Sequence, residues 1–218
     1  MKKVLLASIM GLAITIVAPV HSTASDTKVS FASYDLALKA LKVAPDVRDG
    51  YARSKFKHWS DLDKNGCNTR NDVIISEALT KPTVDKGCKI VANTGKWYSA
   101  YDGITITNFS ALDVDHFVPL AEAWDSGANN WDAAKREVYA NDMGDPISLI
   151  AVSATTNRSK SDQDPAEWLP AKDVCTYVQN WIYVKTRWSL TVDEKELKAL
   201  KDNLSKCPKK KVVVNVVK

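Results

Sequence analysis

The chain has 218 residues, of which 30 are Lys or Arg and 26 are Asp or Glu, and its formal net charge is +4 at pH 7. Because basic and acidic residues are nearly equal in number, the total charge alone would not bind nucleic acid. A phosphate-binding surface would have to be a local patch of basic residues. The length is sufficient for one domain with a sizeable core.

The first 24 residues have the three parts of a secretory signal peptide: Lys2 and Lys3, an apolar run over 4–20, and small residues up to Ala24. Cleavage after Ala24 would leave 194 residues (218 − 24) with 28 basic against 26 acidic side chains, a net charge of +2. The alternative, a membrane anchor, is disfavoured because the run is short and contains Pro19. We therefore expect a soluble monomer that is not stably associated with a membrane, periplasmic or extracellular in a bacterium.

Four cysteines follow the predicted leader: Cys67, Cys88, Cys175 and Cys207. An even number in an exported protein favours two disulfides, and four cysteines allow three pairings. We predict the sequence-local pairs, Cys67 with Cys88 and Cys175 with Cys207, because each brackets a compact segment. The alternative is a tetrahedral zinc site, but no C-x-x-C pair is present.

The N-terminal part predicts helices and a basic segment. Apolar spacing indicates a helix over about 33–42 and a second short helix after Pro45. Residues 51–59 are basic and aromatic and include His58, so they could contact a phosphate backbone or pack around a core tryptophan.

The segment from Asp61 to Asp72 resembles a calcium-binding EF-hand loop, with acids at positions one and three, an amide at five and Gly66 at six. Position twelve is Asp where the motif has Glu, so a plain turn pinned by Cys67 is the alternative. Arg70 is a candidate contact for a substrate phosphate. The calcium ligands would be Asp61, Asp63, Asn65 and Asp72.

Short elements are predicted from there to the middle of the chain. We expect a helix over about 71–79 and then short strands in a twisted meander between 88 and 107. A strand over 112–118, a helical turn at 120–124 and a helix over about 131–139 should follow. A second strand at 148–154 should lead into a helix capped by Thr155 or Thr156.

The two predicted strands and the last helix bring together the parts of a one-metal phosphodiesterase. Asp115 and His116 end the first strand, and Asn157 begins the helix. Cutting a phosphodiester needs a base that deprotonates water and a cation that neutralises charge on the phosphate. His116 can act as the base, while Asp115 and Asn157 offer oxygen ligands suited to a hard cation.

Two long segments, DVDHFVPLAEAW and YANDMGDPISLIAVSATTNRSKSDQDPAEWLP, resemble exported HNH-type endonucleases related to the C-terminal domain of the GmrSD restriction system. The similarity extends from about residue 59 to residue 181. It implies a ββα-metal core that hydrolyses DNA, or RNA, with one divalent cation, Mg²⁺ or alternatively Mn²⁺.

The resemblance also implies roles for particular residues. His116 matches the general base, and Asp115 and Asn157 match the metal ligands. The middle Asn of the HNH name has no secure counterpart, since Ser148 lies near its place and Asn141 is the nearest amide. From the residues themselves, we expect Glu122 to face solvent and Trp124, Trp168 and Trp181 to be core residues, because tryptophan has a large apolar area to bury. Phosphate oxygens would be held by Arg158, Lys160 or Arg136.

We therefore predict an α+β protein with a ββα-metal (HNH, or His-Me finger) core, flanking helices, a small β meander and two disulfides. Residues 1–24 are the signal peptide and 25–218 form a single nuclease domain with its core at about 110–170. The predicted function is a secreted, metal-dependent endonuclease with little sequence specificity. The alternative is a non-catalytic exported protein that binds nucleic acid or calcium; a metallopeptidase is disfavoured because H-E-x-x-H is absent.

Overall fold

The computed structural model describes residues 26–218, so the predicted signal peptide lies outside the described residues. Within this range the chain is a mixture of helices and short strands, which confirms the α+β class. The helices are α1 (Tyr34–Ala40), α2 (Thr69–Ser76), α3 (Leu120–Asp125), α4 (Ala133–Ala140), α5 (Ala154–Lys160), α6 (Val174–Arg187) and α7 (Glu194–Leu204). The strands are β1 (Thr27–Phe31), β2 (Val84–Asp85), β3 (Lys89–Ile90), β4 (Trp97–Tyr98), β5 (Thr105–Ile106), β6 (Leu112–His116), β7 (Leu149–Ser153) and β8 (Val212–Val216).

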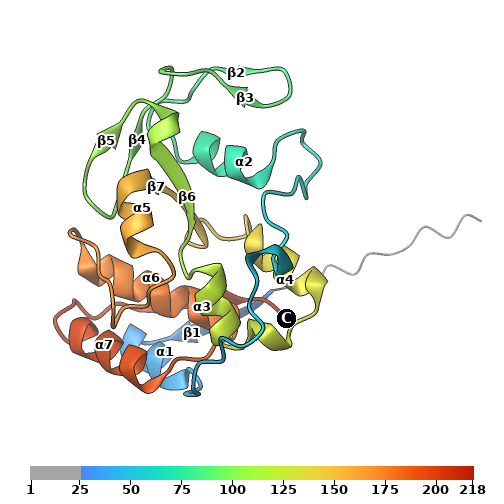
Figure 1. Cartoon of the computed structure of the whole chain (residues 1–218). Helices are drawn as coiled ribbons and strands as arrows, with labels where there is room; N and C mark the ends of the chain where they lie inside the picture. Colours follow the sequence, from blue (N-terminus) through green and yellow to red (C-terminus); the bar gives the residue numbers. More distant parts are fainter. Residues whose placement is uncertain (1–25) are drawn as a thin grey trace, which may run out of the picture.

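The strands pair two by two. The ends of the described chain come together because β1 runs antiparallel to β8, and β6 pairs antiparallel with β7. The predicted meander is instead two separate hairpin-like pairs, β2 with β3 and β4 with β5. Figure 1 shows α1, α6, α7 and β1 gathered in one half of the molecule and β2 to β7 with α2 and α5 in the other.

The β6–β7 pair separates two hydrophobic clusters, because successive side chains of a strand point to opposite faces. One face packs against α2, and the other joins the main core built around α6 (Figure 1). The first cluster includes Val73, Ile74, Leu112, Val114, Leu149 and Ala151. The second includes Phe117, Val152, Val178, Trp181 and Ile182. The strand pair is thus held on both faces, which fixes the position of its polar side chains.

Both predicted disulfides are present. Cys67 is bonded to Cys88 with a Cα–Cα distance of 5.1 Å, and Cys175 is bonded to Cys207 with a distance of 5.5 Å. The first ties the start of α2 to the β2–β3 turn, and the second ties the start of α6 to the segment after α7. No helix within residues 26–218 is long and apolar enough to span a bilayer.

Three local predictions need correction. Residues 41–52 form no helix, because tertiary bonds engage the segment: Val47 N donates to Asp125 O at 3.1 Å, and Trp124 Nε1 donates to Asp49 O at 3.1 Å. The N-cap of α5 is Ser153, whose Oγ accepts from Thr156 N, rather than Thr155 or Thr156.

The third correction concerns Glu122, which is buried rather than facing solvent. Its Oε1 accepts a hydrogen bond from Lys185 Nζ at 2.5 Å, and Lys185 also bonds Glu196 at 3.0 Å. All three side chains lie inside the protein, where a charge requires a partner. Glu122 therefore joins α3 to α6 and α7 instead of serving the candidate site.

Candidate active site

The β6–β7–α5 unit brings together residues that are far apart in the sequence. In the antiparallel register Asp115 lies opposite Ile150 and His116 opposite Leu149. Helix α5 begins directly after β7 and packs on both strands. Its Asn157 and Lys160 contact β6 across 44 or 45 positions of sequence. The predicted order of two strands and one helix is therefore present.

Side chains of β6 divide between the two faces of the strand pair. Asp113 and Asp115 are two positions apart and both contact α5, through Asn157 and Lys160 respectively. His116 points to the opposite face, toward the end of α4. The predicted base and the predicted acidic ligand are thus adjacent in sequence but have different surroundings.

His116 is buried and its ring is held in one orientation. Its Nε2 lies 2.9 Å from the main-chain oxygen of Ala140. A carbonyl oxygen only accepts, so Nε2 carries the hydrogen and the lone pair of the neutral ring is on Nδ1. The Trp59 ring covers one face of the imidazole, with ring centroids 5.2 Å apart.

Burial lowers the pKa of His116 to about 3, against a smaller opposing effect of the hydrogen bond to Ala140. The ring is therefore neutral at physiological pH, which is the state that a general base needs. The other ring nitrogen, Nδ1, has no hydrogen-bond partner among the described residues, so its lone pair is left for a water molecule.

Asp115 is buried in an ion pair. Its Oδ2 lies 2.8 Å from Lys160 Nζ and accepts a hydrogen bond from Tyr101 Oη at 2.6 Å. Burial raises the pKa of Asp115 and lowers the pKa of Lys160, so removal from water opposes the charged form of both groups. Lys160 is fully buried, and its ammonium therefore lies inside the protein rather than on a surface that a phosphate could reach.

Asp113 is a further candidate for the site, which our sequence reasoning missed. Asn157 Nδ2 lies 3.4 Å from Asp113 Oδ2, and Arg158 Nε lies 3.5 Å from the same oxygen. The Asp113 side chain is 27% exposed and that of Arg158 is 74% exposed, so both are open to a ligand. Strand alternation could have identified Asp113, because it is two positions before Asp115.

The other predicted phosphate contacts have structural partners. Arg136 donates to the main-chain oxygens of Trp131, Ala128 and Lys55, and its guanidinium lies over the Trp124 ring. Arg70 donates to Leu112 O at 3.1 Å, beside the start of β6. Arg158 is therefore the predicted phosphate contact whose side chain is most open.

The two candidates for the middle Asn hold different parts of the loop between α4 and β7. Asn141 is buried, donates to Lys57 O at 2.8 Å and accepts from Ser60 N at 2.8 Å. Ser148 Oγ donates to Asp142 Oδ2 at 2.6 Å. Asn141 directly follows Ala140, whose main-chain oxygen binds His116. Its amide thus connects the end of α4 to the segment around His58.

The EF-hand-like loop also closes on itself. Asn65 Nδ2 donates to Asp63 Oδ2 at 2.9 Å and to Asp72 Oδ1 at 3.2 Å, and Asp61 Oδ1 accepts from Asn65 N at 3.1 Å. The four predicted calcium ligands therefore lie together. A three-residue cluster of potential metal ligands in residues 26–218 includes Asp72, but its other members, Cys67 and Cys88, form a disulfide.

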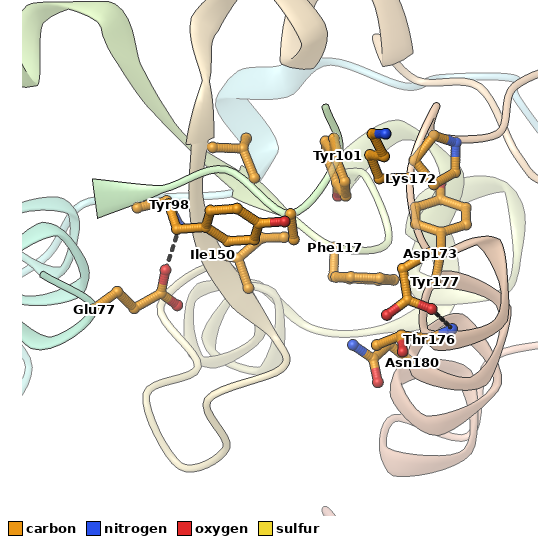
Figure 2. A pocket seen from close by; sticks show the side chains of 14 residues that line it. Glu77, Tyr98, Tyr101, Phe117, Ile150, Lys172, Asp173, Thr176, Tyr177 and Asn180 are labelled. Atoms are coloured by element: carbon orange, nitrogen blue, oxygen red, sulfur yellow. Dashed lines mark hydrogen bonds between the residues drawn. The ribbon is translucent and has the colours of Figure 1, made fainter. Parts of the chain in front are cut away.

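A separate cavity of about 140 Å³ lies along the outer edge of β7. Figure 2 shows Glu77 at one end and Asp173, Thr176 and Asn180 at the other, with aromatic side chains between them. Glu77 Oε2 accepts from Ala151 N at 2.7 Å. A cavity of this size holds about one ring. It contains none of the predicted catalytic, metal-binding or phosphate-binding side chains.

The side chains around β6 and α5 fit a hard divalent cation in their chemistry. Such ions take carboxylate and amide oxygens, which Asp113, Asp115 and Asn157 offer from one side of the strand pair. In this structure the positive charge next to Asp115 is the ammonium of Lys160. A divalent cation bound by Asp115 would therefore compete with this ammonium for the carboxylate.

An adjacent acid and histidine on a strand pair, followed by a helix, is the arrangement that the sequence resemblance implied. Residues 68–203 match the family model described as "GmrSD restriction endonucleases, C-terminal domain". The chain therefore belongs to this family. An "Uncharacterized secreted protein" of Arthroderma benhamiae is 42% identical over 173 residues, which cover 78% of this chain and 82% of that protein. No solved structure matches the chain.

Proposed function

We propose that the protein is a secreted endonuclease that hydrolyses phosphodiester bonds of DNA, or alternatively of RNA, with little sequence specificity and with one Mg²⁺ or Mn²⁺ ion. The observation that carries the proposal is His116, whose ring is fixed through Nε2 on Ala140 while Nδ1 is left for a water molecule. Membership of a family of restriction endonucleases supports the same chemistry.

In this proposal His116 Nδ1 takes a proton from a water molecule, and the resulting hydroxide attacks phosphorus in line with the departing 3′ oxygen. A bound divalent cation supplies charge neutralisation at the scissile phosphate and at the leaving oxygen. Asp115 and Asn157 would hold it, together with Asp113 on the same face of β6. Exposed Arg158 would bind a non-bridging phosphate oxygen.

Further parts of the proposal concern the whole chain. Residues 25–218 form a single nuclease domain with an HNH-like core at about 110–170, and residues 1–24 direct export and are then removed. The two disulfides support an oxidising location. Calcium at Asp61, Asp63, Asn65 and Asp72 would have a structural role.

The test is cleavage of supercoiled plasmid by the oxidised protein with Mg²⁺, with Mn²⁺ and with a chelator. We expect metal-dependent nicking that His116→Ala reduces by about 10²–10⁴-fold, the usual contribution of a general base. Asp113→Asn should also lose activity, whereas the matched strand carboxylate variant Asp85→Asn, in the exposed β2, should cut normally.

An unreduced rate in His116→Ala would refute the assignment of the base. Intact plasmid in every lane, with folding and disulfides verified, would refute the nuclease proposal. In that case a mobility shift without shortening of the DNA would favour the non-catalytic binding protein.

A further inference from the structure

Two histidines lie side by side at the candidate site although 58 positions separate them in the sequence. The rings of His58 and His116 have centroids 6.3 Å apart and planes at 78°. The residues that match the family model are 68–203, so the family assignment gives no role to His58. Its position therefore requires an explanation from this structure.

The two rings are each held by a main-chain oxygen, but through different ring nitrogens. His58 Nδ1 lies 2.9 Å from the main-chain oxygen of Phe56, so Nδ1 carries a hydrogen and Nε2 is the second site of protonation. His116 has the reverse arrangement, with Nε2 held by Ala140 and Nδ1 left over. Among the described residues neither remaining nitrogen has a hydrogen-bond partner. Each ring is thus left with one nitrogen through which a proton can be exchanged.

The end of α4 fixes both rings. Ala140 O binds His116, and the next residue, Asn141, binds Lys57 O and Ser60 N on either side of His58. Glu137, one turn earlier, accepts from Ser60 Oγ at 2.8 Å. His58 is half-buried, and its position depends on this polar attachment rather than on complete burial in a core.

The proposed reaction has one requirement that His116 does not meet. When the P–O3′ bond breaks, the 3′ oxygen needs a proton, and a positioned acid speeds that step. Lys160 is buried and paired with Asp115, so its ammonium is not accessible to a substrate. His58 is the second imidazole next to the base, and it is half-buried.

We propose that His58 is a second catalytic residue, the general acid that protonates the departing 3′ oxygen; this rests on the proposed nuclease function. His116 Nδ1 gains a proton from water as the hydroxide oxygen bonds to phosphorus. The P–O3′ bond breaks, and the 3′ oxygen takes the Nε2 proton of a His58 imidazolium, which becomes the neutral ring. The products are a 5′-phosphate and a 3′-hydroxyl, and both imidazoles recover their starting forms by exchange with water.

The test compares two DNA substrates that differ at one atom. In the first the scissile phosphate is linked to the 3′ carbon through oxygen, and in the second through sulfur, which leaves as a thiolate without a proton. The variant is His58→Asn, because its amide keeps a donor for Phe56 O but transfers no proton. Lys57→Gln is the matched control, since it removes a positive charge from the same segment and leaves the His58 imidazole in place.

All rates are measured with Mn²⁺, which accepts both oxygen and sulfur ligands, and unfolding midpoints verify that each variant folds. We expect His58→Asn to slow cleavage of the oxygen-linked substrate by about 10²–10⁴-fold, the usual size of general-acid catalysis. On the sulfur-linked substrate its rate should be close to that of the wild type. Lys57→Gln should change both rates by the same factor.

Equal losses of His58→Asn on both substrates would overturn the proposal and assign His58 to positioning, and so would a wild-type rate on the oxygen-linked substrate. In both cases cleavage by the wild-type protein would leave the nuclease function standing. If the wild-type protein cuts neither substrate, the nuclease function and this inference fail together.

Discussion

Replacing Lys160 with Met tests the candidate metal site through stability. The ammonium of Lys160 lies 2.8 Å from Asp115, and the two side chains are 0% and 7% exposed. Removing one partner of a buried pair costs about 3–5 kcal/mol. We expect the lower end, about 3 kcal/mol, because burial raises the pKa of Asp115 and the carboxyl can take up a proton. For a domain of this length the melting temperature should fall by roughly 6–12 °C.

A divalent cation should reverse part of this loss if Asp115 is a ligand. Without the ammonium, the carboxylate needs another positive charge, and cation binding stabilises the folded state by about 2.7 kcal/mol at 100 times the dissociation constant. The matched control is Lys185→Met. Lys185 is also fully buried, but its partners Glu122 and Glu196 are not candidate metal ligands. This variant should lose stability without regaining it in Mg²⁺.

The assay is thermal unfolding of both variants and the wild type, with a chelator and with saturating Mg²⁺. The expected result is a larger Mg²⁺-induced rise for Lys160→Met than for Lys185→Met. An equal rise in the two variants would refute Asp115 as a metal ligand. A loss below about 1 kcal/mol for Lys160→Met in chelator would refute the ion-pair reasoning itself, since exposed pairs are worth that much.

Three further predictions concern single side chains. Burial raises the pKa of Glu77 from 4.5 to about 7, so its proton stabilises the folded state at low pH and this contribution is lost as the pH rises through about 7. Glu77→Gln should flatten the pH dependence of the urea unfolding midpoint between pH 4.5 and about pH 7. An unchanged pH profile would show that the Glu77 proton does not stabilise the folded state. Arg158→Ala, in the His116→Ala background, should make the slope of log affinity against log salt less negative by about 0.9 for duplex DNA, and an unaltered slope would exclude a phosphate contact. Ca²⁺ should raise the melting temperature of the wild type but not of Asp63→Asn, and an equal rise in both proteins would argue against the predicted loop site.

Local patterns were sufficient to predict the parts of the fold that are decided within a few residues. The strand, acid and histidine of β6 and the amide at the start of α5 lie in short segments with clear periodicity. The disulfides followed from the number and spacing of the cysteines. Asp113 was missed although the same alternation of side chains places it beside Asp115.

Longer-range features could not be predicted in this way. Helix α6 is surrounded by other elements and nine of its 14 residues are buried, so it has no single apolar stripe to reveal it. The pairing of β1 with β8 joins the two ends of the described chain. The contact between His58 and His116 depends on Asn141, which holds the segment around His58 from the end of α4.

The fate of the basic residues shows why composition says little about the binding surface. Lys160, Lys185 and Arg187 are all buried, and each is paired with a carboxylate. These cations neutralise internal acids and add nothing to the attraction of a phosphate backbone, which depends on accessible charge. The proposed function therefore requires that a phosphate-binding patch come from exposed residues beside the candidate site. Arg158 on α5 and the basic segment before His58 meet that condition, and they lie on the two elements that contact β6 and His116.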